Sequence, residues 1–389
     1  MKMLYITQSE TNSGFFDWGN EKYIYGHTKK MLDQIEVFCT LGIDTKFYDH
    51  LKLRKIQKVN VWDKVKLRLP YSSIYSQIIY TDAINGYDAY YIRVVSSDYN
   101  LYRFLKKLRK NNLYAKILLE FPNMDYGEEF SHRMIDMPIY WKIQHFFKKT
   151  EKIIDRSITM NGSHQFKNYK NIPIINGIVT KRIKAIDNSQ QFDYNEIHLG
   201  MVAGFWPVHG VDILIESLHQ YYLNGKKEKK IFIHLVGVGP YMSDYHELVK
   251  KYHLEDYVFF YGHLLNEQLD QIYEKFDIGI CEMAAFRREY PISSCLKSRE
   301  YLAKGLPMVS SIKNDAIKEG YPYFKLIETS KGVFNMKEIV SFYEEVYRDK
   351  EVKEVRDEIR HYAEENVEMQ VTLKPIIDYF GPMSRFSTS

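Results

Sequence analysis

The sequence predicts an α/β protein in which two doubly wound parallel sheets follow each other along the chain. Its 389 residues are enough for two domains of ordinary size. With 45% hydrophobic and 27% charged residues, the composition is that of a folded globular protein. Short runs rich in β-branched and aromatic residues alternate with longer helical stretches, which is typical of parallel sheets covered on both faces.

The strand–helix alternation occurs twice along the chain. In the first half, strands are expected at 4–7, 45–48, 90–95, 116–121, 157–160 and 172–175, with helices for example at 26–41 and 101–111. In the second half, strands are expected at 198–203, 231–237, 258–262, 278–282 and 308–311, and helices at 211–223, 241–252, 266–276 and 294–304. The stretch 335–380 is mainly helical and charged.

A polar stretch at 181–196 separates the two series and predicts a linker. We therefore expect an N-terminal domain at 1–180, a C-terminal domain at 197–365, and a helical tail at 366–389 that packs back on the N-terminal domain. Two such domains create a cleft between the carboxyl ends of their strands, where ligands bind in doubly wound folds.

The ends of the chain and its cysteines indicate a cytoplasmic protein. The first residues turn polar too soon for a signal peptide, and no apolar run is long enough to cross a bilayer. The three cysteines, Cys39, Cys281 and Cys295, form no C-x-x-C pair, which fits a reducing compartment. No zinc motif and no D-x-D motif is present, so we expect no metal and no other cofactor.

Charge is divided unequally between the two halves. Residues 1–180 hold 27 basic and 18 acidic side chains, a balance of +9, whereas residues 181–389 hold 27 and 32, a balance of −5. Residues 51–70 carry seven Lys/Arg and one Asp, and residues 103–116 carry six and no acid. Both segments suit an anionic membrane surface, although solvated helix faces would explain them equally well. No nucleic-acid-binding module is visible.

The stretch 290–307 (Y-P-I-S-S-C-L-K-S-R-E-Y-L-A-K-G-L-P) predicts a capped helix that could hold a diphosphate. Ser293 or Ser294 is a suitable N-cap residue, and Gly305 ends the helix. Lys297 and Glu300 are three residues apart and share one face. A diphosphate would be bound by the free N–H groups of the first turn and by Lys297, and Glu300 could accept hydrogen bonds from a ribose. A surface helix with an ion pair is the alternative.

Other candidates lie near the ends of predicted strands. In the second half these are Gly239 in a G-V-G-P turn, His209, Arg287 and Arg288. In the first half they are Gly14, His27, Glu120, Asp125 and Tyr126. Positions of this kind favour contacts with a phosphate, a sugar or an acceptor hydroxyl. Each could equally be an ordinary turn, cap or solvated loop residue.

In order and spacing, the stretches 237–240, 257–262, 273–278 and 294–307 resemble the C-terminal domain of glycosyltransferase family 4. The resemblance is specific over about residues 198–312 and weaker before them. It implies the GT-B fold, with two Rossmann-like domains facing a cleft, and metal-independent, retaining transfer from a nucleotide-sugar. The stretches 208–212 (V-H-G-V-D) and 120–122 (E-F-P) look most like the bacterial branch that builds surface polysaccharides.

The resemblance also implies roles for individual residues. Glu300 matches the glutamate that holds the donor ribose, and Lys297 with the serines at 293 and 294 matches the diphosphate site. His209 stands where most members have a lysine before glycine. His263 and Leu264 match the loop that reads the base, and Gly14 matches the glycine loop under the transferred sugar.

Three departures from the family pattern leave the group that assists chemistry open. The first glutamate of E-x7-E would fall on Ile292; Glu289 or Glu282 could substitute for it, although neither is in register. The usual arginine is absent near Ala203. Glu120 stands where the family has a histidine, so the catalytic candidates are Lys297, Glu300 and Glu120.

We therefore expect a glycosyltransferase that acts on a lipid-linked or glycan acceptor in the synthesis of capsule, exopolysaccharide or O-antigen. Such a protein would work at the inner face of the cell membrane. Two alternatives stay open: a GT-B-fold nucleotide-sugar epimerase, and a non-catalytic partner built on a degraded transferase.

Overall fold

The computed structural model divides the chain into two compact units. Unit 1 comprises Met1–Ile175 and Thr372–Ser389, and unit 2 comprises Asn176–Val371. The structure describes residues 1–8, 26–48, 51–52, 61–69, 71, 77–121, 130–131, 134–160, 165–187, 192–223, 229–287, 292–329 and 332–381. Of the predicted site residues, Gly14, Asp125, Tyr126 and Arg288 lie outside this part, as does the side chain of His27.

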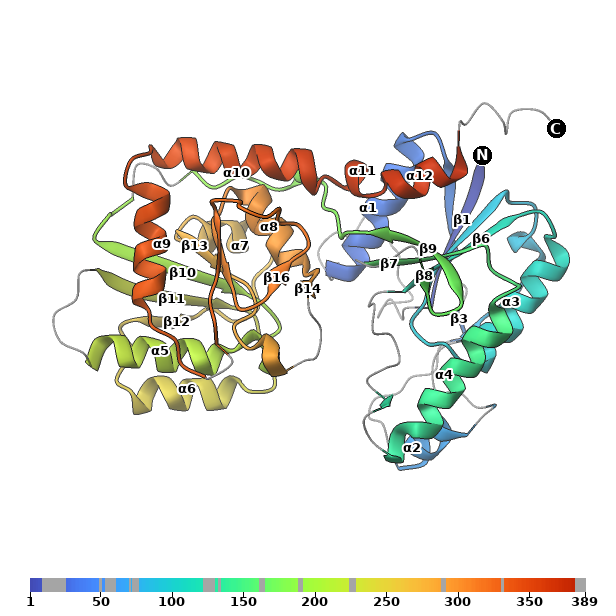
Figure 1. Ribbon diagram of the computed structural model, residues 1–389, viewed down its shortest axis with the longest axis horizontal. Coiled ribbons are helices and arrows are strands. Elements are labelled where there is room, and N and C mark those ends of the chain that lie inside the picture. Colours follow the sequence, from blue (N-terminus) through green and yellow to red (C-terminus); the bar gives the residue numbers. More distant parts are fainter. Residues whose placement is uncertain are drawn as a thin grey trace. The chain divides into compact units, whose positions relative to one another are not determined.

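Unit 1 is built around a seven-stranded sheet among its described residues (Figure 1). The strand order is β2 (Asp44–Tyr48), β1 (Lys2–Thr7), β5 (Ala89–Arg93), β6 (Lys116–Phe121), β7 (Arg156–Met160), β9 (Tyr169–Ile174) and β8 (Gln165–Phe166). Neighbouring strands are parallel except β8 and β9. Because helices cover both faces, the strands read as nearly continuous apolar runs, as in β6 (K-I-L-L-E-F).

The other described elements of unit 1 are short strands and helices. They are β3 (Leu51–Lys52), β4 (Gln77–Ile78), α1 (Gly26–Thr40), α2 (Val61–Arg68), α3 (Tyr99–Asn111), α4 (Met137–Thr150) and α12 (Lys374–Phe380). The last of these belongs to the expected tail, and Tyr379 within it lies against the Arg156 guanidinium of β7. Thus the final helix of the chain completes unit 1.

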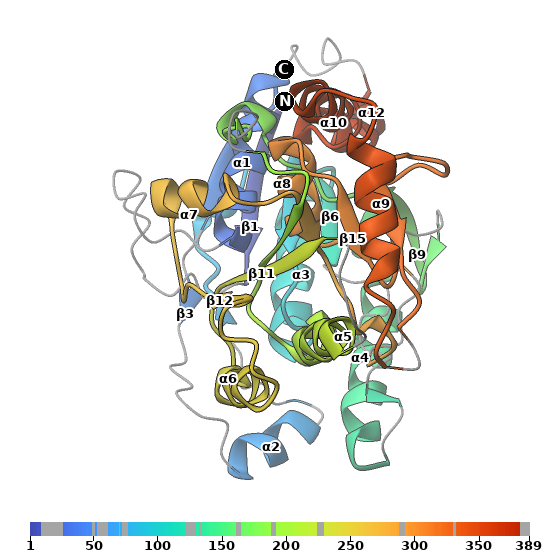
Figure 2. The same ribbon diagram turned by 90° about the vertical axis from the view of Figure 1, so that its left-hand side faces the viewer.

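Unit 2 contains a parallel six-stranded sheet in its described part. Its order is β12 (Val258–Phe260), β11 (Lys230–Val236), β10 (Glu196–Val202), β13 (Ile278–Ile280), β15 (Met308–Ser310) and β17 (Phe324–Leu326). The remaining elements are β14 (Ile292–Ser293), β16 (Lys313–Asn314), α5 (Val211–Leu223), α6 (Met242–Lys251), α7 (Asn266–Tyr273), α8 (Leu296–Lys304), α9 (Lys337–Tyr347), α10 (Val352–Asn366) and α11 (Met369–Thr372). Figures 1 and 2 show α5 and α6 together on one side of this sheet, and α8 and α10 on the other.

The direction of winding reverses between β10 and β13. From β10 the chain proceeds to β11 and β12 on one side, then returns to β13, β15 and β17 on the other. The loops that follow β10 and β13 therefore diverge, and doubly wound sheets bind ligands at such a reversal. The order of strands thus singles out one edge of unit 2 as a candidate binding site.

The predicted α/β class and the two sheets are confirmed, while some boundaries differ. The predicted linker 181–196 lies inside unit 2, and the predicted tail is divided between the units. The predicted N-cap at Ser293 or Ser294 was wrong, because α8 begins at Leu296 after Cys295 and Ser293 belongs to β14. Among the described helices, none is both long and apolar enough to span a bilayer.

Candidate functional site

The loops that follow β10 and β13 lie side by side in unit 2. The backbone N–H of Met283 donates to the carbonyl of His209 at 3.1 Å, and that of Ala284 donates to Val208 at 3.1 Å. Gly210 has a φ of +66°, and a Cβ there would lie 2.7 Å from the carbonyl carbon of Met283. Only glycine fits both the left-handed backbone and this close approach, so Gly210 fixes how the two loops meet.

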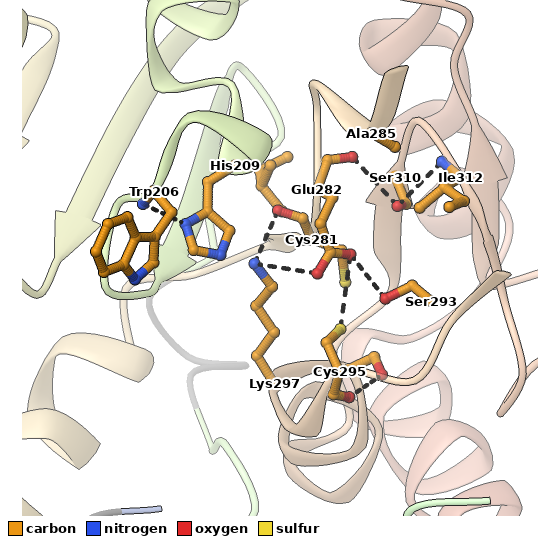
Figure 3. A network of polar contacts seen from close by, with 12 residues as sticks. Trp206, His209, Cys281, Glu282, Ala285, Ser293, Cys295, Lys297, Ser310 and Ile312 are labelled. Atoms are coloured by element: carbon orange, nitrogen blue, oxygen red, sulfur yellow. Dashed lines mark hydrogen bonds and ion pairs between the residues drawn. The ribbon is translucent and has the colours of Figure 1, made fainter. Parts of the chain in front are cut away.

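Lys297 places a buried cation at this edge of the sheet (Figure 3). It is the second residue of α8, and its side chain is only 9% exposed. The ammonium donates to the Cys281 carbonyl at 3.2 Å and lies 3.8 Å from Oε1 of Glu282. A lysine cation near a helix N-terminus adds to the partial positive charge of the helix end. Lys297 and the first turn of α8 therefore form a region where a bound anion would be stabilised.

Glu282 is the carboxylate beside Lys297. Its Oε2 accepts a hydrogen bond from the Ser293 hydroxyl at 3.1 Å and one from the Cys295 thiol at 3.7 Å. The pKa of this carboxyl is raised to about 7, mainly by burial and in part by the Cys295 sulfur, while Lys297 and the Ser293 hydrogen bond oppose the rise. Glu282 was not among the predicted site residues. The sequence signals for it were its place at the end of a predicted strand and its candidacy as an out-of-register substitute for the first glutamate of E-x7-E.

His209 lies on the other side of Lys297. Its Nδ1 accepts a hydrogen bond from the backbone N–H of Trp206 at 2.9 Å, which leaves Nε2 as the donor in the neutral imidazole. Figure 3 shows the ring between Trp206 and the Lys297 ammonium. The predicted residues His209, Ser293 and Lys297 are thus brought together, with Glu282 among them.

Arg299 anchors the start of α8 from inside unit 2. Its guanidinium, which is fully buried, pairs with Asp315 and donates to the Asn176 carbonyl at 3.0 Å and to Oδ1 of Asn314 at 3.1 Å. Asn176 also donates to the carbonyl of Ser294 at 2.5 Å. This buried network, which the sequence did not predict, holds the turn before α8 in place.

Glu300 and Arg287 have partners within unit 2. Oε2 of half-buried Glu300 accepts from the Tyr273 hydroxyl of α7 at 3.5 Å. The Arg287 guanidinium binds both carboxylate oxygens of Asp212, at 2.9 and 2.5 Å, and the Pro207 carbonyl at 2.8 Å. Arg287 therefore joins the loops after β10 and β13.

The remaining predicted residues of unit 2 follow β11 and β12. A Cβ on Gly239 would lie 2.6 Å from the carbonyl oxygen of Gly204, so this turn packs closely on the loop after β10. The Gly237 N–H donates to the Gly262 carbonyl at 2.7 Å, which links this turn to His263 and Leu264. His263 is exposed and Leu264 is half-buried. All these loops lie at the carboxyl edge of one parallel sheet.

Glu120 belongs to unit 1. It is a residue of β6, within the predicted strand 116–121, and it is fully buried. Its carboxylate accepts from Lys30 at 3.3 Å, Arg93 at 3.0 Å and the Tyr91 hydroxyl at 2.6 Å. Burial alone would raise the pKa of Glu120, but these partners outweigh it and lower the pKa to about 2. Glu120 is thus held as an anion within the sheet.

Comparison with known proteins gives one family and many similar folds. Residues 182–319 match the family described as Glycosyl transferases group 1. No curated protein matches the chain by sequence.

Several solved structures match almost the whole chain, among them the following three. Sucrose-phosphate synthase from Thermosynechococcus elongatus is 12% identical, with a TM-score of 0.61 over 98% of this chain and 99% of that one. Anabaena HepE in complex with UDP-glucose is 14% identical, with a TM-score of 0.56 over 98% and 99%. The lipopolysaccharide outer core galactosyltransferase WaaB is 13% identical, with a TM-score of 0.53 over 97% and 100%.

These findings identify the fold of the protein. The two Rossmann-like units have the GT-B fold of glycosyltransferases, as the resemblance implied. The match of residues 182–319 to the glycosyltransferase group 1 family supports a transferase of GT-B type. Membership of family 4, retention of configuration and the roles of single residues remain predictions.

Proposed function

We propose that the protein transfers a sugar from a nucleoside diphosphate sugar to an acceptor, with retention of configuration and without a metal ion. The observation that carries the proposal is the buried Lys297 ammonium on the first turn of α8, beside the loops where the sheet reverses its winding. A group placed there would meet positive charge from both the lysine and the helix end.

The proposed chemistry depends on charge that develops on the leaving diphosphate. As the sugar–phosphate bond breaks, negative charge grows on the phosphate oxygen, and Lys297 with the first turn of α8 would stabilise it. His209 would donate from Nε2 to the same group, and Glu300 would hold the ribose. The departing phosphate oxygen would take the proton of the acceptor hydroxyl, so no strong protein base is required.

For the acceptor, we propose a lipid-linked or glycan chain in the synthesis of a bacterial surface polysaccharide such as capsule, exopolysaccharide or O-antigen. The resemblance of 208–212 to that branch supports this proposal, and so does the lipopolysaccharide-directed activity named for the structurally similar WaaB. Such an acceptor would be met at the inner face of an anionic membrane, which fits the basic balance of residues 1–180.

The proposal is tested by product analysis with Lys297→Met, a change that removes the charge and keeps much of the side-chain volume. We expect the wild type to form an α-linked product from an α-linked donor, as read by NMR of the anomeric proton. Since loss of one preorganised donor costs about 10²–10³ in rate, kcat/KM should fall by that factor in the variant.

Lys304→Met is the matched control, because it removes another buried ammonium of α8 that pairs with Asp270 instead. Equal losses of kcat/KM in both variants would contradict the role of Lys297. An inverted product would contradict retention. Epimerisation of the donor without an acceptor would favour the epimerase, and the absence of both donor binding and turnover would favour the non-catalytic partner.

A further inference from the structure

An exposed apolar surface lies on unit 1 at α2, at the 3-10 turn Met134–Asp136 that precedes α4, and on α4 itself. We call it the α2–α4 face. We propose that this face inserts into the interface of an anionic lipid bilayer. It includes Val61, Trp62, Leu69, Met134, Ile135 and Trp141. The inference sharpens the membrane partner proposed above, but it does not depend on the transfer reaction.

The exposure of these side chains is unusual for their size. Trp62 is 74% exposed, Trp141 is 62% exposed and Met134 is 93% exposed. Single exposed apolar residues are common, but a group that contains two tryptophans marks an interaction surface. Figures 1 and 2 show α2 beside the first turns of α4, which brings the two parts of the face together.

The exposed apolar residues of α2 lie on one side of the helix. At about 100° per residue, Val61, Trp62 and Val65 of α2, together with Leu69 directly after its end, fall within an arc of about 100°. All four are exposed, whereas Asp63 on the other side is buried. Lys66 lies at one margin of this apolar arc, and Lys64 lies beyond the other. Apolar stripes bordered by lysines are typical of helices that lie in a membrane interface.

Polar contacts fix the orientation of α2. Nη2 of Arg68 pairs with Oδ1 of Asp136 at 2.6 Å, and its Nε donates to the Ile135 carbonyl at 2.7 Å. Lys142 of α4 donates to the Leu67 carbonyl at 2.5 Å. These bonds attach α2 to α4 and to the turn before it. They fix the rotation of α2, so its apolar arc stays exposed.

The charges favour a lipid surface over a second copy of the chain. Tryptophan and tyrosine prefer the interface, where one part of the ring is apolar and the other meets polar headgroups. Each lysine near an anionic surface adds about 1 kcal/mol of attraction. In a symmetric dimer, by contrast, the same lysines would face like charges across the contact.

The second basic segment, 103–116, supplies positive charge but no exposed row of apolar side chains that could insert into a membrane. In α3 the apolar side chains Leu101, Phe104, Leu105 and Leu108 are buried in the core. The exposed residues of this helix include Arg103, Lys106, Lys107 and Lys110. Of the two segments predicted to meet a membrane, only α2 in 51–70 therefore shows an exposed apolar arc among the described residues.

The test is flotation of the full chain with vesicles of phosphatidylcholine, with and without phosphatidylglycerol. We expect the wild type to float with the phosphatidylglycerol vesicles and its tryptophan emission to shift to the blue. The double variant Trp62→Ser/Trp141→Ser should lose about tenfold or more of its vesicle partition coefficient, since it loses much of the inserted apolar area.

Tyr114→Ser is the matched control, because Tyr114 is an exposed aromatic residue after α3 and outside the α2–α4 face. It should float like the wild type. Thermal unfolding of all variants should agree, since the side chains changed are exposed. Equal flotation of the double variant and the wild type would overturn the inference. So would a dimer of the wild type that the double variant abolishes, because the face would then join two copies.

Discussion

At the scale of single residues, the central feature is the pair formed by Lys297 and Glu282. Both side chains are buried, and their charged atoms are 3.8 Å apart. Glu282 loses solvation that the single cation only partly replaces, which is why burial raises its pKa to about 7. Near neutral pH the carboxyl therefore changes charge beside the cation that we propose for the diphosphate.

This titration predicts how stability depends on pH. The folded protein keeps the Glu282 proton up to about pH 7, whereas the unfolded chain loses it near 4.5. The contribution of Glu282 to stability is therefore present below pH 4.5 and falls as the pH rises to 7. Relative to the wild type, Glu282→Gln should gain stability over this window, by at most about 3 kcal/mol.

Urea unfolding of both proteins between pH 4 and 8 measures this difference. Burial also raises the pKa of Asp277 to about 7, but that group is present in both proteins and cancels. A difference in unfolding free energy that stays constant from pH 4 to 8 would rule out the titration.

At the scale of elements, the loops after β10 and β13 and the start of α8 hold the site together. Gly210 sets the approach of the two loops, Arg287 ties them through Asp212, and Arg299 anchors the turn before α8. The partners in these contacts lie up to 123 residues apart in the chain, as for Arg299 and Asn176, so local sequence patterns could not predict them.

Gly210→Ala tests the close approach of the loops. We expect a loss of stability of several kcal/mol, because the new Cβ would be 2.7 Å from the Met283 carbonyl carbon and the backbone φ is +66°. Gly320→Ala is the control, since its φ is +78° but nothing lies within 4 Å of its Cβ. That variant should lose only about 1–2 kcal/mol from backbone strain. Equal losses in urea unfolding would contradict the steric role of Gly210.

Arg299→Met tests the buried anchor. Removing one partner of a buried ion pair leaves Asp315 uncompensated, so we expect a loss of about 3–5 kcal/mol in unfolding free energy. Arg348→Met breaks an exposed pair with Glu344 and should cost about 0.5 kcal/mol or less. If chemical denaturation gives the two variants the same stability, the buried network does not have the role assigned to it.

The sequence predicted the positions of helices and strands better than the side-chain contacts between them. Strand–helix alternation located the main sheets, and glycine after Lys304 marked the end of α8. It misplaced the start of this helix, because serine preference suggested a cap whereas the Ser293 hydroxyl bonds to Glu282. The sequence did not predict a buried role for Arg299. Its guanidinium can be buried only because Asp315 and the Asn176 carbonyl bind it, and neither is its neighbour in the chain. Glu120, which was predicted near the end of a strand as a candidate for chemistry, is fully buried within β6.

At the scale of the whole molecule, the net charge of +4 combines two opposite balances. The basic excess falls in residues 1–180, where the α2–α4 face lies. Residues 181–389 are acidic overall, yet within them the Lys297 ammonium lies at the N-terminus of α8. Local arrangement, rather than the sum of charges, thus decides where an anion would be stabilised.

The same arrangement predicts that transfer needs no divalent metal. Lys297 and the first turn of α8 would supply the positive charge for the leaving diphosphate, so initial rates should be unchanged in excess EDTA. The assay compares untreated enzyme, enzyme with EDTA, and enzyme with EDTA and added Mg²⁺. Loss of the rate with EDTA and its recovery with Mg²⁺ would contradict this prediction.

The most direct test of the central claim is calorimetric titration of the protein with a panel of nucleoside diphosphate sugars. We predict that at least one of them binds the wild type and the Lys304→Met control with similar affinity. The same sugar should bind Lys297→Met at least about tenfold more weakly, which corresponds to about 1.4 kcal/mol. Unchanged affinity in Lys297→Met, with unfolding temperatures that agree, would contradict a donor site at the start of α8.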